Sequence, residues 1–279
     1  MPQTFYEVVW IFLIYAFVGW CSEVSYAALD LGEFVNRGFL NGPFCPIYGV
    51  GVLIVVVILT PLKKNLAVLF VGSVLLTSIL EYATGFLLEK IFHNKWWDYS
   101  DFPFNIKGYV CLKFSVLWGL ACTFVVLIFH PIVLTFIHLI PQLAGTVILV
   151  ILCLVVGVDF IFTVSTILKF NKRLRVMGEV ARKLRGISDE IGFNIYENVS
   201  EIIDKKEAVE SSMQSNLEKK KKEYEELSLR YKELAEKKIY GHERLMRAFP
   251  GMKSRVDNES LVKIRAHLKE LVKNRRNGR

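Results

Sequence analysis

Long apolar runs alternate with short polar segments through the first 168 residues. Four runs, at 8–29, 66–88, 109–129 and 143–168, are long enough to cross a hydrocarbon core about 30 Å thick, which takes roughly 20 helical residues. A fifth run at 46–61 is shorter and bounded by prolines. The pattern predicts an all-α, polytopic membrane helix bundle with about five crossings. The apolar segment 130–141 would make a sixth if it entered the bilayer rather than lying at its surface.

Composition and charge divide the chain into two parts. It is 53% hydrophobic with a mean hydropathy of +0.37, which is too apolar for an ordinary soluble domain. Residues 1–168 carry 7 basic and 9 acidic side chains, whereas 169–279 carry 28 and 18. Because Lys and Arg concentrate in cytoplasmic loops, we expect 169–279 to be a cytoplasmic tail. With five crossings, we expect a multi-pass protein of the cell membrane with its amino terminus outside. We expect no cleaved signal, because "MPQTFYEVVW" has no basic side chain.

The basic tail has the periodicity of helices. The pattern predicts one long helix over about 190–240 and a second over about 257–275. A 3.5-residue apolar seam at 224–234 is typical of a coiled coil, so the tail helix is a candidate for homo-oligomerisation. The basic patch at 169–185 either fixes the topology or attracts anionic lipids of the bilayer. Nucleic acid is not an expected partner, because aromatic side chains do not alternate with these charges.

Four ionisable residues fall within the apolar runs, where a charge costs about 2.5 to 3.5 kcal/mol if it faces lipid. They are Glu23, Glu81, Lys113 and Asp159, each roughly 9 to 15 Å from the expected cytoplasmic edge. Small and polar residues at helical spacing accompany the three acids, which indicates faces turned inward. One interpretation is a shared polar cavity open to the cytoplasm. The other is that these groups satisfy one another or backbone groups as packing contacts.

Two polar loops follow the helices that carry the two glutamates. The first, "NRGFLNGPFCPIYGVG" (36–51), is rich in glycine and proline, and the second (93–111) is rich in aromatic residues. Irregular backbone survives at membrane depth only where protein or a wet cavity satisfies its hydrogen bonds. We therefore expect Asn36, Arg37, Trp97 and Asp98 to lie at the mouth of the bundle as substrate-binding residues. Alternatively, the loops are interfacial turns anchored by their aromatic rings.

These segments resemble a known bacterial family. The motifs are Gly-Trp with a downstream Glu, Asn-Arg-Gly-Phe, Gly-Pro-x-Cys-Pro-Ile-Tyr-Gly, Leu-Glu-Tyr, Trp-Trp-Asp-Tyr-Ser and Ser-x-x-Trp-Gly. Over about residues 10–131 the sequence is similar to the family named Putative ABC-transporter type IV, or ABC transporter permease. The resemblance implies the membrane component of a transporter driven by ATP. The sequence has no GxxxxGK[ST] phosphate loop, so a separate ATPase subunit would be the partner.

Three functions compete on these grounds. The first is a permease-like transporter component whose carboxylates bind substrate or carry protons. The second is a scaffold or regulatory protein that works through its basic helical tail. The third is a membrane enzyme acting on a lipid-linked substrate with Arg37, Glu81, His93, Asp98 and Asp101, although no nucleophile–base pair or metal-ligand cluster is spaced to favour it. No cofactor is implied, and the five cysteines, which include no CxxC, are interpreted as packing residues.

Overall fold

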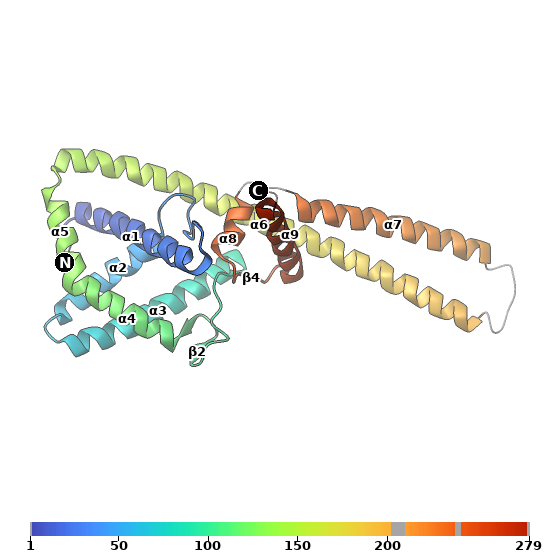
Figure 1. Cartoon of the computed structure of the whole chain (residues 1–279), viewed down its shortest axis with the longest axis horizontal. Helices are drawn as coiled ribbons and strands as arrows, with labels where there is room; N and C mark the ends of the chain where they lie inside the picture. The colour runs from blue at the N-terminus through green and yellow to red at the C-terminus, as the bar shows by residue number, and fades with distance from the viewer. Residues whose placement is uncertain (1, 202–209, 238–240, 278–279) are drawn as a thin grey trace. The chain divides into compact units, whose positions relative to one another are not determined.

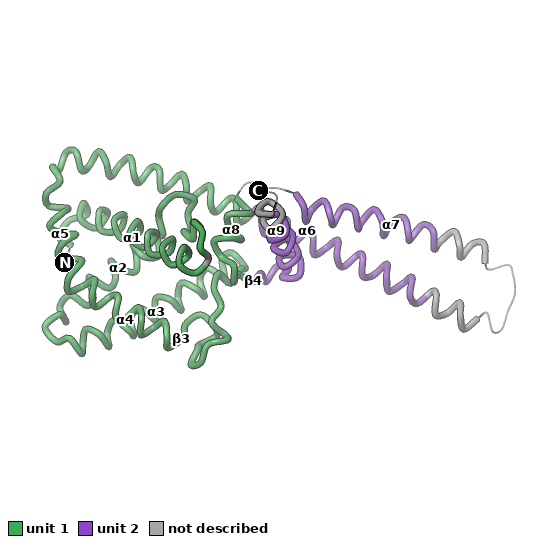
Figure 2. Tube along the Cα trace, viewed as in Figure 1, with its two compact units in different colours: residues 1–168, 240–253 green, residues 169–239, 254–279 purple. Residues whose placement is uncertain are grey.

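The computed structural model describes residues 2–201, 210–237 and 241–277, and in these the chain is almost entirely helical (Figure 1). The prediction of an all-α helix bundle is confirmed. Contacts divide the chain into two units, residues 1–168 with 240–253 and residues 169–239 with 254–279 (Figure 2). The helices are α1 (Phe5–Leu31), α2 (Pro46–Leu59), α3 (Leu66–Phe92), α4 (Leu112–Phe124), α5 (His130–Leu139), α6 (Gln142–Glu201), α7 (Glu210–Glu236), α8 (His242–Ala248) and α9 (Asn258–Asn277).

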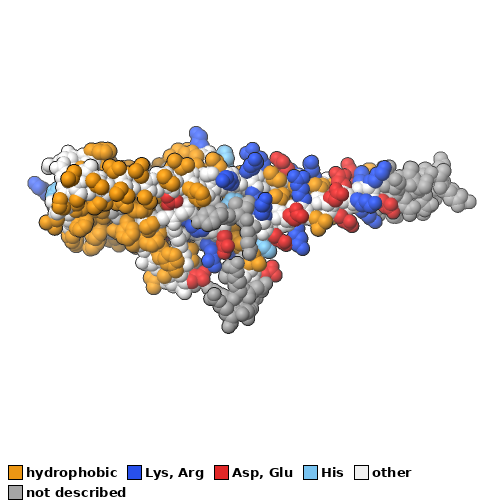
Figure 3. Space-filling view, turned by 90° about the horizontal axis from the view of Figure 1, so that it is seen from above, with side chains coloured by type: hydrophobic (Ala, Val, Ile, Leu, Met, Phe, Trp, Pro, Cys, Tyr) orange, Lys and Arg blue, Asp and Glu red, His pale blue; other side chains and the backbone are white. Residues whose placement is uncertain are grey.

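Among the described residues, four helical stretches are long and apolar enough to cross a membrane: Phe5–Asp30, Leu66–Phe92, Leu112–Leu139 and Gln142–Phe193. Pro46–Leu62, which joins α2 to the 3₁₀ turn Thr60–Leu62, is a shorter apolar helix. Side chains such as Ile79 and Ile161 are 63% and 70% exposed on these helices, as expected where lipid is the solvent. In Figure 3, hydrophobic side chains cover the unit that contains residues 1–168, and charged side chains gather over the unit that contains residues 169–239.

Capping residues define where the first and third helices begin and end. The Thr4 hydroxyl accepts a hydrogen bond from the Glu7 amide at the start of α1, and the Asn65 side chain caps α3 in the same way. α1 ends at Gly32, whose φ of 67° is left-handed, and α3 ends at His93 with a φ of 55°. Both helices therefore stop where a polar loop begins.

The segment 130–141 is not a separate surface helix. α4 continues through a π-helical turn, Val125–Phe129, into α5, so that one 28-residue apolar stretch runs from Leu112 to Leu139. Pro131 has no amide hydrogen, and its ring would clash with the Leu127 carbonyl in a regular α-helix. The wider π-turn, closed by the hydrogen bond from the His130 amide to the Val125 carbonyl, relieves this clash and lets the helix continue.

Glycines bring the membrane helices into close contact. A Cβ on Gly49 of α2 would lie 2.5 Å from the Phe12 carbonyl of α1, and one on Gly19 of α1 would collide with the Tyr48 ring of α2. Gly119 of α4 stands against Val74 of α3 in the same manner. Small residues are what allow backbones to approach this closely in lipid. The bundle is thus built on two tight helix pairs, α1 with α2 and α3 with α4.

The described part of the chain contains four two-residue strands: β1 (Asn94–Lys95), β2 (Asn105–Ile106), β3 (Val110–Cys111) and β4 (Lys253–Ser254). β2 and β3 pair antiparallel, with Asn105 opposite Cys111 and Ile106 opposite Val110. This small hairpin folds the second polar loop back on itself.

The tail unit differs from the predicted single helix over 190–240. Lys220 of α7 lies 2.5 Å from Glu190 of α6, whereas 30 residues of one straight helix would separate them by about 45 Å. The two helices therefore lie side by side, and residues 202–209 fall outside the described part. Arg173 of α6 donates to the Leu234 and Ala235 carbonyls, and the Tyr231 hydroxyl lies 3.2 Å from that of Ser260 on α9. The apolar seam at 224–234 thus has neighbours within its own chain.

Candidate functional site

The first polar loop closes on itself around Asn36. The Asn36 side-chain oxygen accepts hydrogen bonds from the Trp20 indole at 2.8 Å and from the Gly38 amide at 3.0 Å. Its amide nitrogen donates to the Asn41 carbonyl at 2.7 Å. Both acceptor positions and one of the two N–H donors of this side chain are therefore used within the loop or toward α1. The arrangement gives Asn36 a structural role, in holding the loop against the end of the helix that carries Glu23.

Asp159 binds the same loop from α6. Its carboxylate accepts hydrogen bonds from the Asn41 amide at 3.2 Å, the Asn41 side chain at 2.9 Å and the Gly42 amide at 2.7 Å. The Thr163 hydroxyl, one turn along α6, accepts a second bond from the Asn41 side chain. The negative charge within this apolar helix is compensated by N–H dipoles of the loop. These contacts agree with the interpretation of Asp159 as a packing residue bound to backbone groups.

Arg244, which is positively charged, binds the carbonyl groups of the same loop. Its guanidinium donates to the carbonyls of Gly38 at 2.9 Å, Phe39 at 3.1 Å and Leu40 at 2.9 Å. N–H groups of the loop therefore bind the Asp159 carboxylate and three of its carbonyls bind the Arg244 guanidinium, so these groups of an irregular backbone segment are hydrogen-bonded by protein. Sequence reasoning missed Arg244, because nothing in the pattern around α8 links it to a loop two hundred residues earlier.

Glu23 lies between two partners from different segments. The Tyr48 hydroxyl of α2 donates to one carboxylate oxygen at 2.5 Å, and the Arg37 Nε lies 3.8 Å from the other. The Arg37 guanidinium also stands over the Tyr26 ring, 5.4 Å from its centroid. Both charged side chains keep about a quarter of their surface exposed, 28% for Glu23 and 24% for Arg37. Arg37, expected at the mouth of the bundle, is thus paired with Glu23, which was expected within the cavity.

Glu81 of α3 faces an aromatic environment. One of its carboxylate oxygens is buried and has no hydrogen-bond partner among the described residues. The Tyr99 hydroxyl and the Trp118 indole are the polar groups that face this carboxylate. Burial, followed by the negative charge of Glu81, raises the pKa of the Tyr99 phenol well above its ordinary value, so this hydroxyl remains a donor. Tyr99 in turn stacks on Phe114 with ring centroids 4.7 Å apart.

The two glutamates belong to one cluster. The Tyr48 ring, bound to Glu23, packs edge-on against the Trp118 ring at 5.7 Å, and Trp118 faces Glu81. Tyr99 also lies within the electrostatic influence of both carboxylates. We call Glu23, Tyr48, Glu81, Tyr99 and Trp118 the acidic–aromatic cluster. It collects side chains from α1, α2, α3, α4 and the second polar loop.

Three members of this cluster were not among the predicted site residues. Tyr48, Tyr99 and Trp118 each stand in a motif that carried the family resemblance: Pro-Ile-Tyr-Gly, Trp-Trp-Asp-Tyr-Ser and Ser-x-x-Trp-Gly. Attention to charge alone overlooked them, because an uncharged hydroxyl or indole in an apolar run looks like ordinary packing. The motifs themselves were the available signal.

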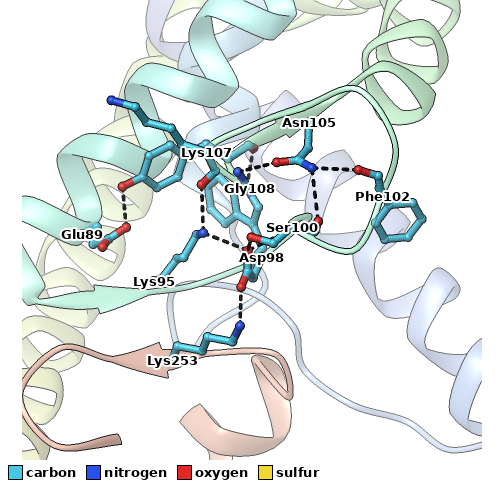
Figure 4. Close-up of polar contacts among 11 residues, drawn as sticks. Glu89, Lys95, Asp98, Ser100, Phe102, Asn105, Lys107, Gly108 and Lys253 are labelled. Atoms are coloured by element: carbon cyan, nitrogen blue, oxygen red, sulfur yellow. Dashed lines mark hydrogen bonds and ion pairs between the residues drawn. The ribbon is translucent and has the colours of Figure 1, made fainter.

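Asp98 lies in a separate network within the second polar loop (Figure 4). It accepts hydrogen bonds from Lys95 at 2.8 Å, from Lys253 at 2.5 Å and from the Ser100 hydroxyl and amide. Burial opposes ionisation, but the donors, Lys253 first, outweigh it and hold the pKa of Asp98 well below its ordinary value. The hydrogen bond and charge of Asp98 correspondingly raise the pKa of Lys253. Asp98 is a permanent anion that organises its loop.

Trp97 and Lys113 take positions that the sequence did not specify. The Trp97 indole donates to the Tyr109 carbonyl at 2.9 Å and packs near Gly85 of α3, so it ties the loop hairpin to the bundle. Lys113 is exposed, and its ammonium stands 5.6 Å and 5.8 Å from the ring centroids of Phe102 and Phe114. The structure thus brings Glu23 and Glu81 together, binds Asp159 to the first loop and leaves Lys113 beside aromatic rings.

Hydrogen-bond donors surround the two carboxylates of the acidic–aromatic cluster. Within the described residues, no group of three or more His, Cys, Asp or Glu side chains is placed to hold a metal ion. The nearest polar neighbours of the two cluster carboxylates are hydroxyl, indole and guanidinium groups, all of which are hydrogen-bond donors. The chemistry available here is hydrogen bonding and proton exchange.

A comparison with known protein families finds one that matches this part of the chain. The family described as Putative ABC-transporter type IV matches residues 10–164, which is more than half of the chain. The chain belongs to this family. No solved structure matches it.

The family region extends beyond the segment recognised from motifs. It continues past residue 131 through α5 and into α6 as far as residue 164, so that it includes Asp159 together with every other predicted site residue. Both loops and all five residues of the acidic–aromatic cluster lie inside it, whereas α7, α8 and α9 lie outside. The apolar helices and membership of the Putative ABC-transporter type IV family are compatible with a membrane transporter component.

Proposed function

We propose that this chain is the membrane-spanning component of a solute transporter and that the acidic–aromatic cluster handles its substrate or a coupled proton. The observation that carries the proposal is the buried, unpartnered oxygen of Glu81, facing Tyr99 and Trp118 in the interior of the bundle. Ionisable groups within membrane helices are costly and normally mark a substrate, ion or proton site. Glu23, joined to the same cluster through Tyr48, supplies a second carboxylate.

The charge distribution supports an orientation for this site. The strongly basic tail favours a cytoplasmic carboxyl end and, with five crossings, an external amino terminus. Glu23 lies near the carboxyl end of α1 and Glu81 near that of α3, in the halves of these helices that lead to Arg37 and Lys95. We therefore propose that the cluster opens toward the cytoplasm, with Arg37 at its mouth.

A separate ATPase is the partner that this function implies. The sequence has no phosphate-binding loop of the GxxxxGK[ST] type, so the chain itself is not proposed to hydrolyse ATP. Family membership supports association with such a subunit. Purification of the full chain from its native membranes should then recover a protein with that motif and ATP-hydrolysing activity.

Glu81→Gln is expected to abolish ligand-dependent stabilisation of the purified protein. A substrate that binds the folded state raises the unfolding free energy by about 2.7 kcal/mol at a hundred times its dissociation constant. The measurement is a thermal-unfolding screen in micelles against cationic, neutral and anionic solutes. Solutes that stabilise the parent should lose at least most of that effect in Glu81→Gln, since the amide cannot ionise.

Asp30→Asn provides the matched control for this screen. Asp30 is an exposed acid at the carboxyl end of α1, outside the acidic–aromatic cluster, and its substitution makes the same change in charge. It should keep every stabilisation seen with the parent. A solute that stabilises parent and Glu81→Gln equally would show that the cluster is not its binding site and would remove the main support for this function.

A scaffold function of the tail is the second candidate, favoured by one observation. The tail unit has its own core, in which Phe170, Leu174 and Met177 of α6 and Leu261 and Ile264 of α9 are at most 1% exposed. A folded unit with exposed basic residues in 169–185 can bind a protein partner, a second copy of the tail or anionic lipid.

We call residues 191–219, the part of the tail beyond the Glu190–Lys220 contact, the outer hairpin. Shortening it tests whether the working surface of the tail lies there or in the remaining unit, which keeps the basic residues of 169–185. Because the Glu190 and Lys220 side chains meet, residues 191–219 can be replaced by a short Gly-Ser turn that leaves the remaining unit intact. If the working surface lies on the outer hairpin, the shortened chain should be inserted normally in membranes yet fail to restore the phenotype of cells that lack the protein. Full restoration would exclude that surface.

A further inference from the structure

The segment Gly241–Lys253 returns to the membrane unit after the long tail hairpin. It contains α8 and belongs to the same compact unit as residues 1–168, although the residues on either side of it belong to the tail unit. Its buried residues include Leu245, Ala248 and Met252, which are 1%, 0% and 0% exposed. The segment is thus an integral part of the bundle that the chain reaches only through the tail.

This segment contacts both polar loops with polar groups. Arg244 holds three successive carbonyls of the first loop, at Gly38, Phe39 and Leu40. Lys253 joins Asp98 of the second loop at 2.5 Å. Charge-assisted hydrogen bonds of this kind contribute about twice as much as neutral ones. Two loops far apart in sequence are therefore held by residues only nine positions apart.

An aromatic contact adds to these ionic ones. The Phe249 ring packs edge-on against Trp96 of the second loop with centroids 4.8 Å apart, and Trp96 packs likewise on Phe39 of the first loop at 5.5 Å. Trp96 is 3% exposed. The three rings thus form a continuous contact from the returning segment through the second loop to the first.

We propose that residues 241–253 form a latch that holds both polar loops closed and whose release opens the first loop. The latch is connected to the tail unit at both of its ends, through residues 169–239 before it and 254–279 after it. A displacement of either chain end of the latch therefore acts on Arg244 and Lys253, which lie near those ends. Release leaves the carbonyls of Gly38, Phe39 and Leu40 without their cation, and they must then bind water.

Opening the first loop changes access to the acidic–aromatic cluster. The loop ends at Cys45, whose amide donates to the Ala16 carbonyl of α1 at 2.9 Å, and α2 begins at the next residue. Tyr48, the partner of Glu23, is the third residue of that helix. The latch therefore controls the entrance to the proposed site, but its contacts and its test do not depend on what the site binds.

Cys45 is a native reporter for the state of the latch. Its side chain is 3% exposed and faces the Phe39 backbone, beside Arg244. Burial raises the pKa of the thiol to about 12, so that little of the reactive thiolate forms at neutral pH. Release of the loop exposes the thiol to water and lowers the barrier to alkylation.

The experiment measures alkylation of Cys45 by N-ethylmaleimide in native membranes, in a full-length chain whose other four cysteines are replaced by serine or alanine. Arg244→Gln should label about tenfold faster or more than the parent, because a neutral amide cannot hold three carbonyls. Arg244→Lys keeps the charge but lacks the forked donors, and should give an intermediate rate. Lys253→Gln, which frees only the second loop, should have the smallest effect of the three.

Arg247→Gln is the matched control, because Arg247 lies one turn along α8, is exposed and contacts Glu243 of the same helix. It should label at the parent rate. A second reporter, Cys122 of α4 as the only cysteine, measures the integrity of the bundle, where it is buried in a cluster with Val55 and Leu59 of α2 and Leu69 of α3. Cys45 as unreactive in Arg244→Gln as in the parent would overturn the latch. The latch would also be overturned if Arg244→Gln increased the labelling rate of Cys122 as much as that of Cys45, since Arg244 would then hold the whole bundle together and not a loop.

Discussion

Asp159→Ala is expected to lower the free energy of unfolding of the membrane unit by about 3 to 5 kcal/mol, the largest effect of any single substitution proposed for this chain. The carboxylate accepts three N–H groups of the first loop, from Asn41 and Gly42, and alanine leaves all of them without an acceptor. The arginine that binds the other side of the loop would then face a segment free to move. Thermal unfolding of the purified chain in micelles, followed by circular dichroism, measures the loss.

Asp159→Asn and Thr163→Val separate charge from geometry in this prediction. Asparagine keeps one acceptor oxygen and should lose about half as much stability, whereas Thr163→Val removes only the hydroxyl contact with Asn41 at 2.9 Å and should cost about 1 kcal/mol. This order follows from the number of N–H groups left unpaired. If Asp159→Ala and Asp159→Asn both unfolded at the temperature of the parent, the loop would not depend on the α6 carboxylate, and the packing interpretation of Asp159 would be wrong.

The sequence predicted the all-α class of the fold because a lipid solvent allows an apolar segment few structures other than a helix. Runs of about 20 apolar residues are stable in lipid as helices, so length and composition alone indicated α1, α3 and α6. The π-turn before His130 was not predictable in the same way, because a proline within an apolar run is compatible with either a break or a locally widened helix. Only the packing of α5 against α1 and α6 decides between them.

The site was predicted in part, for reasons that differ from residue to residue. The cost of a bare carboxylate in lipid correctly implied that Glu23 and Asp159 face protein groups, and both do. Which groups they face depends on contacts between positions 25 to about 118 residues apart, and hydrophobic periodicity carries no information on such pairs. Arg244 shows the limit most clearly: its three acceptors are backbone carbonyls, which every residue possesses.

Gly49→Ala is expected to destabilise the bundle by about 2 to 3 kcal/mol, although alanine is the better helix former. A Cβ at this position would lie 2.5 Å from the Phe12 carbonyl and 2.6 Å from its ring, and a backbone atom cannot move aside as a flexible side chain can. α1 and α2 must then separate. The same interface places the Tyr48 hydroxyl against Glu23, so the substitution should also weaken that hydrogen bond.

Gly51→Ala is the control that isolates this effect. Gly51 lies two residues further along α2, and a Cβ there meets nothing within 4 Å. With no steric conflict, only the gain in helix propensity remains, so Gly51→Ala should be neutral or stabilise the chain by up to about 1 kcal/mol. Thermal unfolding of the two variants in the same micelles gives the comparison. The opposite signs follow from the close approach of α1 and α2 at Gly49 alone, and two variants that both stabilised the chain would show that these helices do not meet there.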